Sequence, residues 1–505
     1  KQWLLLSIIL PKMIPSVGST TVVYLHENCC KSRSGTQAMS KKKAKRGKTK
    51  KSSELIRTDV WDLITSPAQK QQMLLTVEEY RKYLLPVVLI VNAQWLNLAE
   101  LTSKEKINAV ERIIHKTADN PEPKHKYFQS IVNRHPSHRK FPSYLRRAAI
   151  ADAIGIVSSF QTRYQEWQSG VRARRDAKPP RLTAMCATYP ALYKGQQIRY
   201  NLNYESCDIK VWSGTDWVWL CGIKVKRHGL NRHLIAGNEI CSPALVVSKN
   251  KCQLSVPVKI DKINREDSDY VVSVDLGINN AATCAVVGKD GTVKARLFIN
   301  PARDIDRRNQ RRMMIATKSK QTQSFTNCKR QKGFCACLYR KSSNINLEIS
   351  RKVARNIVEF AKTHNVKVIV IENLSGWKAK AGKKGSLIKQ KFHLWCHSKI
   401  VEIVTDRWTE FGGEVQAINP KYTSAYAFDG SGKVKRNKLN YSLALFKSGK
   451  QYNCDLSASY NIGARYWYCL IMGDKQFSRV FVGKSSNDTL RTPITLETLR
   501  SLRTC

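Results

Sequence analysis

Acidic residues are scarce in this chain. Its 505 residues include 38 Asp and Glu against 87 Lys and Arg, which gives a formal net charge of +49. Such an imbalance weakens the compact state through self-repulsion, and it says more about binding partners than about the fold. The phosphate backbone of nucleic acids is the usual partner of such a surplus. We therefore expect nucleic-acid binding, with an anionic membrane surface as the less favoured alternative.

Long apolar runs and internal repeats are also missing. No run reaches the length of about 18 residues that a membrane-spanning helix requires, so we expect no membrane association. The hydrophobic share of 42%, with 11 Trp, 19 Tyr and 13 Phe, is nevertheless enough to form packed cores and excludes a disordered basic protein. At about 150 residues per domain, the length predicts two to four domains.

The spacing Cys-x-x-Cys does not occur among the 15 cysteines. They are scattered singly apart from Cys29-Cys30 and the cluster of Cys328, Cys335 and Cys337. This pattern indicates neither an ordinary zinc finger nor a disulfide framework. The odd spacing of the cluster also argues against structural zinc there. We expect reduced thiols, which are typical of the cytosol or nucleus.

Residues 1–53 are interpreted as a disordered, basic N-terminal segment. Met39 directly precedes a lysine-rich run at 41–51, so our hypothesis is that the natural protein starts at Met39. The apolar start of the chain is short and interrupted by Pro11, which argues against a signal peptide. For the lysine run, a nucleic-acid-binding tail is favoured over a nuclear address.

The first half of the chain changes character twice. Residues 54–85 mix strand and helix signals, residues 86–178 show helical spacing, and residues 179–264 show short alternating runs that predict a small β-barrel. Arg146 and Arg147 fall off the apolar stripe of one predicted helix. They are candidates for contact with a nucleic-acid backbone, with a solvated helix face as the alternative.

The second half reads as an α/β domain. A basic stretch at 303–341 is poor in apolar residues and is interpreted as an exposed, phosphate-facing loop or helix, with Arg307, Arg308, Arg311 and Arg312 as candidate nucleic-acid contacts. The predicted strands are 271–275, 282–287, 293–299, 366–371 and 415–418, and the predicted helices are 344–365, one ending at Gly412-Gly413, and one after residue 455.

Three carboxylates lie where predicted elements begin or end. Asp275 ends a strand, Glu372 ends a buried apolar strand, and Asp455 opens a helix. Carboxylates on rigid elements can hold two divalent ions about 3.5–4 Å apart for phosphodiester cleavage. Asp275 could instead be a turn residue, and Asp455 an ordinary helix N-cap. Glu372 is the hardest to explain structurally, because burying a carboxylate without a partner costs several kcal/mol.

The motifs around these carboxylates resemble those of a known family. The segments Val-Asp-Leu-Gly-Ile-Asn-Asn-Ala-Ala, Val-Ile-Val-Ile-Glu-Asn-Leu and Asp-Leu-Ser-Ala-Ser-Tyr-Asn-Ile resemble the three RuvC motifs of TnpB proteins. These proteins are carried by insertion sequences, are ancestral to the type V CRISPR effectors, and are related to Fanzor proteins. The resemblance is specific over residues 265–470, whereas upstream it concerns only the architecture.

This resemblance implies an α+β multidomain fold. A wedge-type β-barrel with a helical recognition insertion precedes an RNase H-like, RuvC-type α/β nuclease domain. The implied parts are the first wedge segment at 54–85, the helical domain at 86–178, the second wedge segment at 179–264, the nuclease domain at 265–420, an inserted target-nucleic-acid-binding flap at 421–454, and the end of the nuclease domain with a tail at 455–505.

The resemblance also implies an activity. It is RNA-guided cleavage of double-stranded target DNA at a single RuvC site, after a guide RNA pairs with the target and a short flanking motif is recognised. Asp275, Glu372 and Asp455 match the catalytic carboxylates, which would bind two Mg²⁺ ions. The implied location is the prokaryotic cytoplasm, in association with the nucleoid. The oligomeric state is left open.

One departure concerns zinc. Family members usually carry four zinc-binding cysteines after a Thr-Ser pair, whereas here Thr423-Ser424 is followed only by Cys454. We expect no zinc at this position. The flap would then be a metal-free version, packed by aromatic and apolar side chains; these are Tyr426, Phe428, Tyr441, Leu443 and Phe446.

Two alternatives to a nuclease remain open. A catalytically weak RNA-guided DNA-binding protein would be expected to have lost one of the three carboxylates, and all three are present. A DNA transposase with an RNase H-like fold would also use three acidic residues. The long helical and β-rich front half fits a channel for a guide–target duplex better than it fits a transposase.

Overall fold

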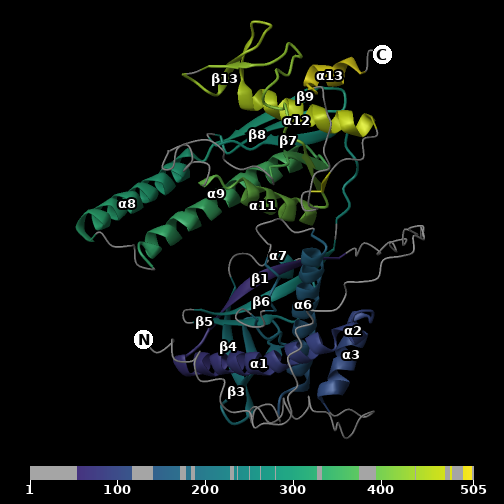
Figure 1. The fold of residues 1–505 in the computed structure, drawn as a ribbon, viewed down its shortest axis with the longest axis vertical. Helices are drawn as coiled ribbons and strands as arrows, with labels where there is room; N and C mark the ends of the chain where they lie inside the picture. Colours follow the sequence, from purple (N-terminus) through teal and green to yellow (C-terminus); the bar gives the residue numbers. More distant parts are fainter. Residues whose placement is uncertain are drawn as a thin grey trace, which may run out of the picture. The chain divides into compact units, whose positions relative to one another are not determined.

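The fold is described by a computed structural model (Figure 1). It describes residues 54–115, 140–170, 178–182, 188–227, 232–235, 237–248, 251–261, 263–278, 280–326, 333–374, 394–437, 439–472, 478–479 and 493–502. The N-terminal segment at 1–53 and Cys328 lie outside these residues, so the expectations for them stay predictions. Among the described helices, none is long and apolar enough to cross a membrane.

The first half forms an antiparallel six-stranded sheet with the order β2-β3-β4-β1-β6-β5. Its strands are β1 (Glu54–Ile64), β2 (Ile198–Tyr200), β3 (Ser206–Trp212), β4 (Trp217–Arg227), β5 (Ala244–Ser248) and β6 (Lys251–Asp261). In β5, the last strand of this order, the amide of Leu245 donates a hydrogen bond to the carbonyl of Pro190 at 3.0 Å. The sheet is a half-barrel, as the alternating runs predicted.

Helices of the first half contribute side chains to the same core as this sheet. They are α1 (Pro67–Ala93), α2 (Trp95–Leu98), α3 (Ser103–Ile114), α6 (Ser143–Gln168) and the short α7 (Arg232–Ile235). Helix α1 starts at a capping box formed by Ser66 and Gln69, with Pro67 at the first helical position. It packs against α6 and β3, and its Met73, Tyr80 and Leu84 are fully buried. The predicted boundary at residue 85 falls inside α1, so the helical part begins earlier than expected.

The second half contains a sheet with the order β15-β11-β10-β7-β8-β9. Its strands are β7 (Tyr270–Asp275), β8 (Ala282–Gly288), β9 (Val293–Ile299), β10 (Val368–Glu372), β11 (Glu414–Ile418) and β15 (Ser478–Arg479). Strands β7, β8 and β9 pair antiparallel, whereas β10 and β11 run parallel to β7. This order confirms the predicted RNase H-like layout.

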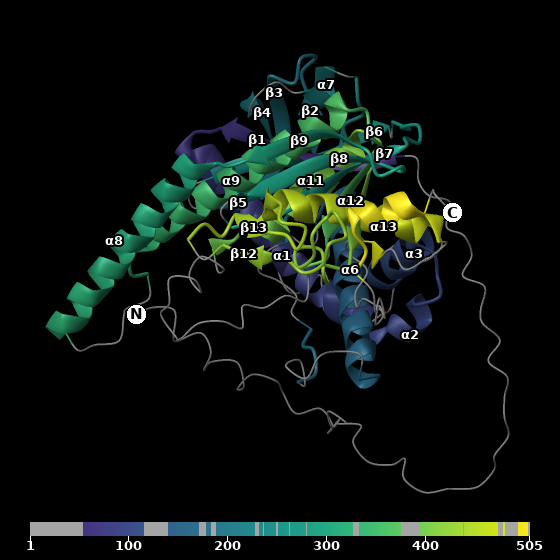
Figure 2. The same ribbon diagram turned by 90° about the horizontal axis from the view of Figure 1, so that it is seen from above.

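Helices cover both faces of the second sheet (Figures 1 and 2). Helices α9 (Ala336–Thr363) and α11 (His397–Glu410) bury one face, which includes Val272, Val274 and Ile369. Helices α12 (Cys454–Ile471) and α13 (Leu496–Ser501) bury the other, which includes Val271 and Val370. Because both faces are covered, the strands read as continuous apolar runs rather than alternating ones.

Helix α12 lies unusually close to this sheet. A Cβ atom built on Gly463 would lie 2.7 Å from the Cβ of Val287 on β8, which is closer than real side chains pack. One turn further on, the indole nitrogen of Trp467 donates to the carbonyl of Val287 at 3.0 Å. Glycine at this position therefore sets how near the helix comes to β8.

The basic stretch after β9 is mostly helical over the residues that the structure describes. Helix α8 (Ala302–Thr326) packs along α9, and Figures 1 and 2 show the two side by side. Arg308 and Ile315 are buried between them and the rest of the domain, while Arg303, Arg307 and Lys318 are exposed. The stretch therefore has one packed face and one cationic face.

A small three-stranded sheet precedes α12. It consists of β12 (Lys435–Arg436), β13 (Leu443–Leu445) and β14 (Gln451–Asn453). Its core contains Ala427, Phe428, Ala444, Phe446 and Cys454. Phe428 and Phe446 pack inside as expected, but Tyr441 is 64% exposed and does not belong to the core. We call residues 421–454 the flap.

Candidate metal centre

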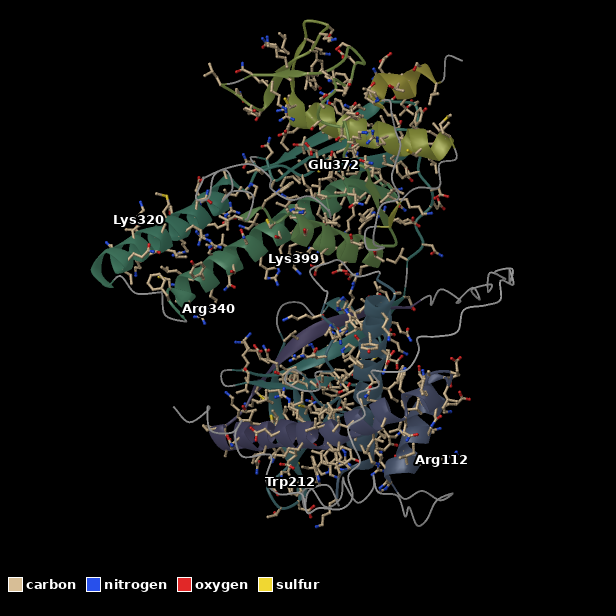
Figure 3. All side chains as sticks on the ribbon, in the orientation of Figure 1. Arg112, Trp212, Lys320, Arg340, Glu372 and Lys399 are labelled. Atoms are coloured by element: carbon tan, nitrogen blue, oxygen red, sulfur yellow. The ribbon has the colours of Figure 1, made fainter. Side chains whose placement is uncertain are left out.

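Asp275 and Glu372 lie side by side at the ends of two neighbouring inner strands of the second sheet. Each is the last residue of its strand, and β7 and β10 are parallel neighbours in which Val274 is paired with Ile371. Neighbouring strands are about 4.8 Å apart, so the residues that follow this pair hold their side chains close together. Figure 3 marks the position of Glu372 in this sheet.

Asp455 reaches the same region from helix α12, which packs on β7 and β8. The helix is capped by Asn453, whose side-chain oxygen accepts from the amide of Leu456 at 2.9 Å. Asp455 lies in the first turn and is therefore not the N-cap, which was the alternative left open by the sequence. Its Oδ2 accepts a hydrogen bond from the side-chain amide of Asn280, just after β7, at 3.3 Å. The sequence motifs thus come together from three elements.

Burial and mutual repulsion define the electrostatics of this group. Burial raises the pKa of the Asp275 carboxyl well above its usual range, and the charges of Glu372 and Asp455 raise it further. Burial also raises the pKa of Glu372, against the opposing effects of the Thr423 hydroxyl and the Arg465 guanidinium. Ionisation of Asp275 and Glu372 is therefore disfavoured at this place in the fold.

The carboxylate oxygens of this group suit Mg²⁺ if water and phosphate complete its coordination. In the described part of the chain, no three His, Cys, Asp or Glu side chains form a group that could hold a metal ion on their own. The carboxylates are thus neighbours without forming a closed cage. Mg²⁺ is usually bound through one or two carboxylates together with water and substrate phosphates, so an open set of oxygen donors suits it. A bound cation would also offset the burial that disfavours ionisation of Asp275 and Glu372.

Four further residues contact or influence the carboxylates and were not identified from the sequence. Asn280 bonds Asp455, Thr423 bonds Glu372, Arg465 lowers the pKa of Glu372, and Arg436 of β12 lowers the pKa of Asp275. Asn280 and Thr423 stand inside or next to recognisable motifs. Arg436 is one cation in a lysine-rich stretch, so nothing in the sequence alone distinguishes it.

Three of the candidate nucleic-acid-binding arginines are engaged within the protein. Arg146 is 8% exposed, and both it and Arg147 form ion pairs with Glu111 at 3.2 Å and 2.6 Å. Arg308 is 7% exposed and donates to the side chain of Asn346 and to the carbonyl of Leu394. Their role in binding stays a prediction, and these contacts give each of them a structural task.

Of the other three candidates, Arg307 alone is exposed. The side chain of Arg307 is 58% exposed and lies 3.5 Å from Asp304. Arg311 and Arg312 are half-buried between α8 and α9, where Arg312 donates to the hydroxyl of Ser342 and covers the ring of Tyr339. Arg307 is therefore the candidate best placed to reach a phosphate.

Comparisons with known proteins match both halves of the chain. Residues 57–213 match the model of the Aq_aa04 family, and residues 255–378 match the OrfB_IS605 model, which is described as a probable transposase. The second match includes Asp275 and Glu372 and ends before Asp455. The TnpB-like protein aq_aa05 of Aquifex aeolicus (strain VF5) is 27% identical over 232 residues, which cover 44% of this chain and 74% of that protein.

The solved structures resemble this chain less closely in sequence. The protein of a Cas12f1–sgRNA–target DNA complex superposes with a TM-score of 0.49 at 12% identity, covering 81% of this chain and 99% of that one. The mini-RNA-guided endonuclease CRISPR-Cas_phi3 superposes with a TM-score of 0.48 at 12% identity, covering 82% and 92%. Superpositions of this quality do not bear on what the chain binds or cleaves. The family model and the curated relative confirm the resemblance to TnpB proteins.

Replacing Asp275 by Asn should stabilise the metal-free protein. Because the pKa of Asp275 is raised, its ionisation destabilises the fold as the pH rises above the unfolded-state value of about 3.9. Removing this charge should increase the free energy of unfolding at pH 7, by about 1.4 kcal/mol for each unit by which the pKa is raised. The gain should shrink toward pH 4. Thermal unfolding in the presence of a chelator measures both effects.

A matched control is Asp306→Asn, which removes an exposed carboxylate of α8. It should leave the unfolding temperature nearly unchanged at both pH values. If Asp275→Asn were no more stable than the wild-type protein at pH 7, burial and the neighbouring carboxylates would not disfavour the ionisation of Asp275 as described.

Proposed function

We propose that this TnpB-like chain is an RNA-guided DNA endonuclease that cleaves target DNA by phosphodiester hydrolysis at a single RuvC-type site. The observation that carries the proposal is the placement of Asp275 and Glu372 on adjacent parallel strands, with Asp455 on the helix that packs over them. The formal charge of +49 supplies the second argument, because it requires a polyanionic partner.

The residues of the site would have different roles in cleavage. Asp275, Glu372 and Asp455 would hold two Mg²⁺ ions, which supply an activated water and stabilise the leaving oxygen when bound. Asn280 keeps the Asp455 carboxylate turned toward β7 through its hydrogen bond. Arg436 adds positive charge next to Asp275, where a phosphate would approach. A single group of carboxylates implies that one site makes every cut.

Guide RNA and double-stranded target DNA would lie on cationic surfaces. Helices α8 and α9 carry exposed cations away from their mutual contact, and Figure 3 labels Lys320 and Arg340 among them. The other exposed cations in the described part of the pair are Arg303, Arg307, Lys318, Lys341, Arg351, Lys352 and Arg355. Phosphate contacts of this kind give affinity and register without reading sequence. Base pairing with the guide would then supply the specificity, and the front half would read a short flanking motif.

The flap would contact the target without zinc. Cys454 is buried in the core of the flap, where Phe428, Phe446 and Tyr452 pack against one another. Lys450 covers the rings of Phe428 and Tyr452. An aromatic core can thus take over the task that four cysteines perform elsewhere. We further propose the prokaryotic cytoplasm, near the nucleoid, as the place of action.

A DNA-strand-transfer transposase is the second candidate, because the matching family model is described as a probable transposase. Both enzymes need the same carboxylates, so the products distinguish them. A guided nuclease leaves broken target DNA, whereas a transposase joins a donor end to the target. A guided DNA-binding protein with a weak site would give neither product.

Two measurements test the proposal directly. Purified protein should carry a discrete RNA, and with that RNA it should cut matched DNA in the presence of Mg²⁺. Asp275→Ala should reduce cutting by at least about 100-fold while target binding is retained, because the change removes a metal ligand and leaves the cationic surfaces intact. Cutting by this variant at the wild-type rate would reject the site, and joined products would favour the transposase.

Arg307 and Arg308 offer a matched pair on neighbouring positions of α8. Arg307→Gln should weaken nucleic-acid binding for every sequence and lower the salt slope by about 1, because an exposed cation is lost. Arg308→Gln should instead lower the free energy of unfolding by about 1–3 kcal/mol, because it leaves buried partners unsatisfied. Binding titrations at several salt concentrations and urea unfolding separate the two effects. An unchanged salt slope in Arg307→Gln would reject its phosphate contact.

A further inference from the structure

We infer that Thr423 is a positioning residue that holds the carboxylate of Glu372 in place, and that Asn461 and Arg465 of helix α12 fix the loop that carries it. The inference rests on the proposed function, in which Glu372 is a metal ligand. It describes contacts that connect Glu372 to helix α12, which carries Asp455.

Thr423 lies at the start of the flap and is 2% exposed. Its hydroxyl donates a hydrogen bond to Oε1 of Glu372, and it also lies 2.9 Å from the carbonyl of Pro420. A hydroxyl has one proton, so it can donate to only one of these oxygens at a time. An ionised carboxylate is the stronger acceptor, and the Glu372 required for metal binding is ionised. Thr423 therefore restrains the carboxylate in the state in which it would act.

Asn461 anchors the loop of Thr423 to α12. It is fully buried, and its side-chain amide donates to the carbonyls of Thr423 at 3.0 Å and Tyr426 at 2.9 Å. Its side-chain oxygen accepts from the amide of Leu496 at 3.2 Å. Because donors and acceptor are all engaged, the side chain has one orientation, and it holds the loop from both sides of Ser424.

Arg465 anchors the beginning of the same loop. It is 1% exposed, and its Nη1 donates to the carbonyl of Asn419, directly after β11. Asn461 and Arg465 are four residues apart, so they lie on the same side of the helix, one turn from each other. The loop from Asn419 to Tyr426 is thus fixed at two points by one rigid element.

The backbone before Thr423 shows that this loop is constrained. Tyr422 has a φ of 74°, in the left-handed region that a non-glycine residue rarely adopts. Such a conformation costs about 1–3 kcal/mol and persists only where surrounding contacts enforce it. Here the anchors on either side enforce it, and the result is that Thr423 turns toward Glu372 rather than toward solvent.

The functional consequence is an effect on metal binding. Residues that orient a metal ligand typically change metal affinity or activity by about 10–100-fold when they are removed. A merely structural threonine would satisfy the Pro420 carbonyl, and its loss would lower stability without a selective effect on metal binding. The two roles therefore differ in a measurable way.

The test compares Thr423→Val and Thr423→Ser in the full chain with its guide RNA. Mn²⁺ binding, followed by calorimetry or electron paramagnetic resonance, is the main readout. Thr423→Val should weaken Mn²⁺ binding by at least about 10-fold, whereas Thr423→Ser keeps the hydroxyl and should stay near the wild-type value. The Mg²⁺ concentration for half-maximal cutting should shift in the same sense. Thr405→Val, which removes a half-buried hydroxyl from α11, is the matched control and should change neither readout.

The outcomes separate this inference from the proposed function. If the wild-type protein binds no Mn²⁺ that depends on Asp275 and Glu372, the proposed metal site is wrong. If it does, and Thr423→Val binds Mn²⁺ as well as the wild type, only the positioning role is overturned. Should Thr423→Val fail to fold, Thr423→Ala repeats the test without placing a methyl group beside the carboxylate. Failure of both to fold would make Thr423 a structural residue and contradict the inference.

Discussion

The cost of ionising carboxylates that are held away from water is the constraint on which the second half of this protein depends. Asp275 and Glu372 are forced together because they end adjacent parallel strands, and Asp455 is brought to them by a helix packed on those strands. Left alone, such a group favours protons over negative charge, as the raised pKa of Asp275 shows. The surrounding parts oppose that tendency in different ways: Asn280 and Thr423 orient carboxylates, while Arg436 and Arg465 supply positive charge. The fold thus maintains an arrangement in which ionisation of Asp275 is unfavourable, and the proposed divalent cations would offset that cost.

Helix α12 combines several of these tasks. It carries Asp455 in its first turn, and it fixes the loop of Thr423 through Asn461 and Arg465 further along. It also forms one side of the aromatic core of the flap through Tyr460. In a chain with a single cysteine in the flap, this packing is what connects the flap to the carboxylates. Loss of the cysteine pattern therefore need not disturb the position of Asp455, because the position is set by helix packing and by the Asn453 cap.

Much of the site could be predicted from the sequence because its signals are local. A continuous apolar run that ends in Glu372 indicates a buried strand with a polar end, and the turn at 289–291 indicates the hairpin that places β9 beside β8. The residues that were missed act across long separations in the chain. Asn461 and Thr423 are 38 residues apart, and nothing in either segment indicates the other. The same holds for Arg146, whose position off the apolar stripe predicted exposure, whereas Glu111 on another helix draws it into the interior. Helical spacing shows which side chains share a face, but not which face receives a partner of opposite charge.

Gly463 determines how close helix α12 can lie to the second sheet. A Cβ atom at position 463 would collide with Val287. The distance between α12 and the sheet therefore depends on the absence of a side chain at this position. The helix is rigid, so any change in that height would move Asp455, Asn461 and Arg465 together, and the separation between the carboxylates would change in one step. The spacing of the carboxylates is thus tied to a residue without a side chain, about two turns along α12 from Asp455.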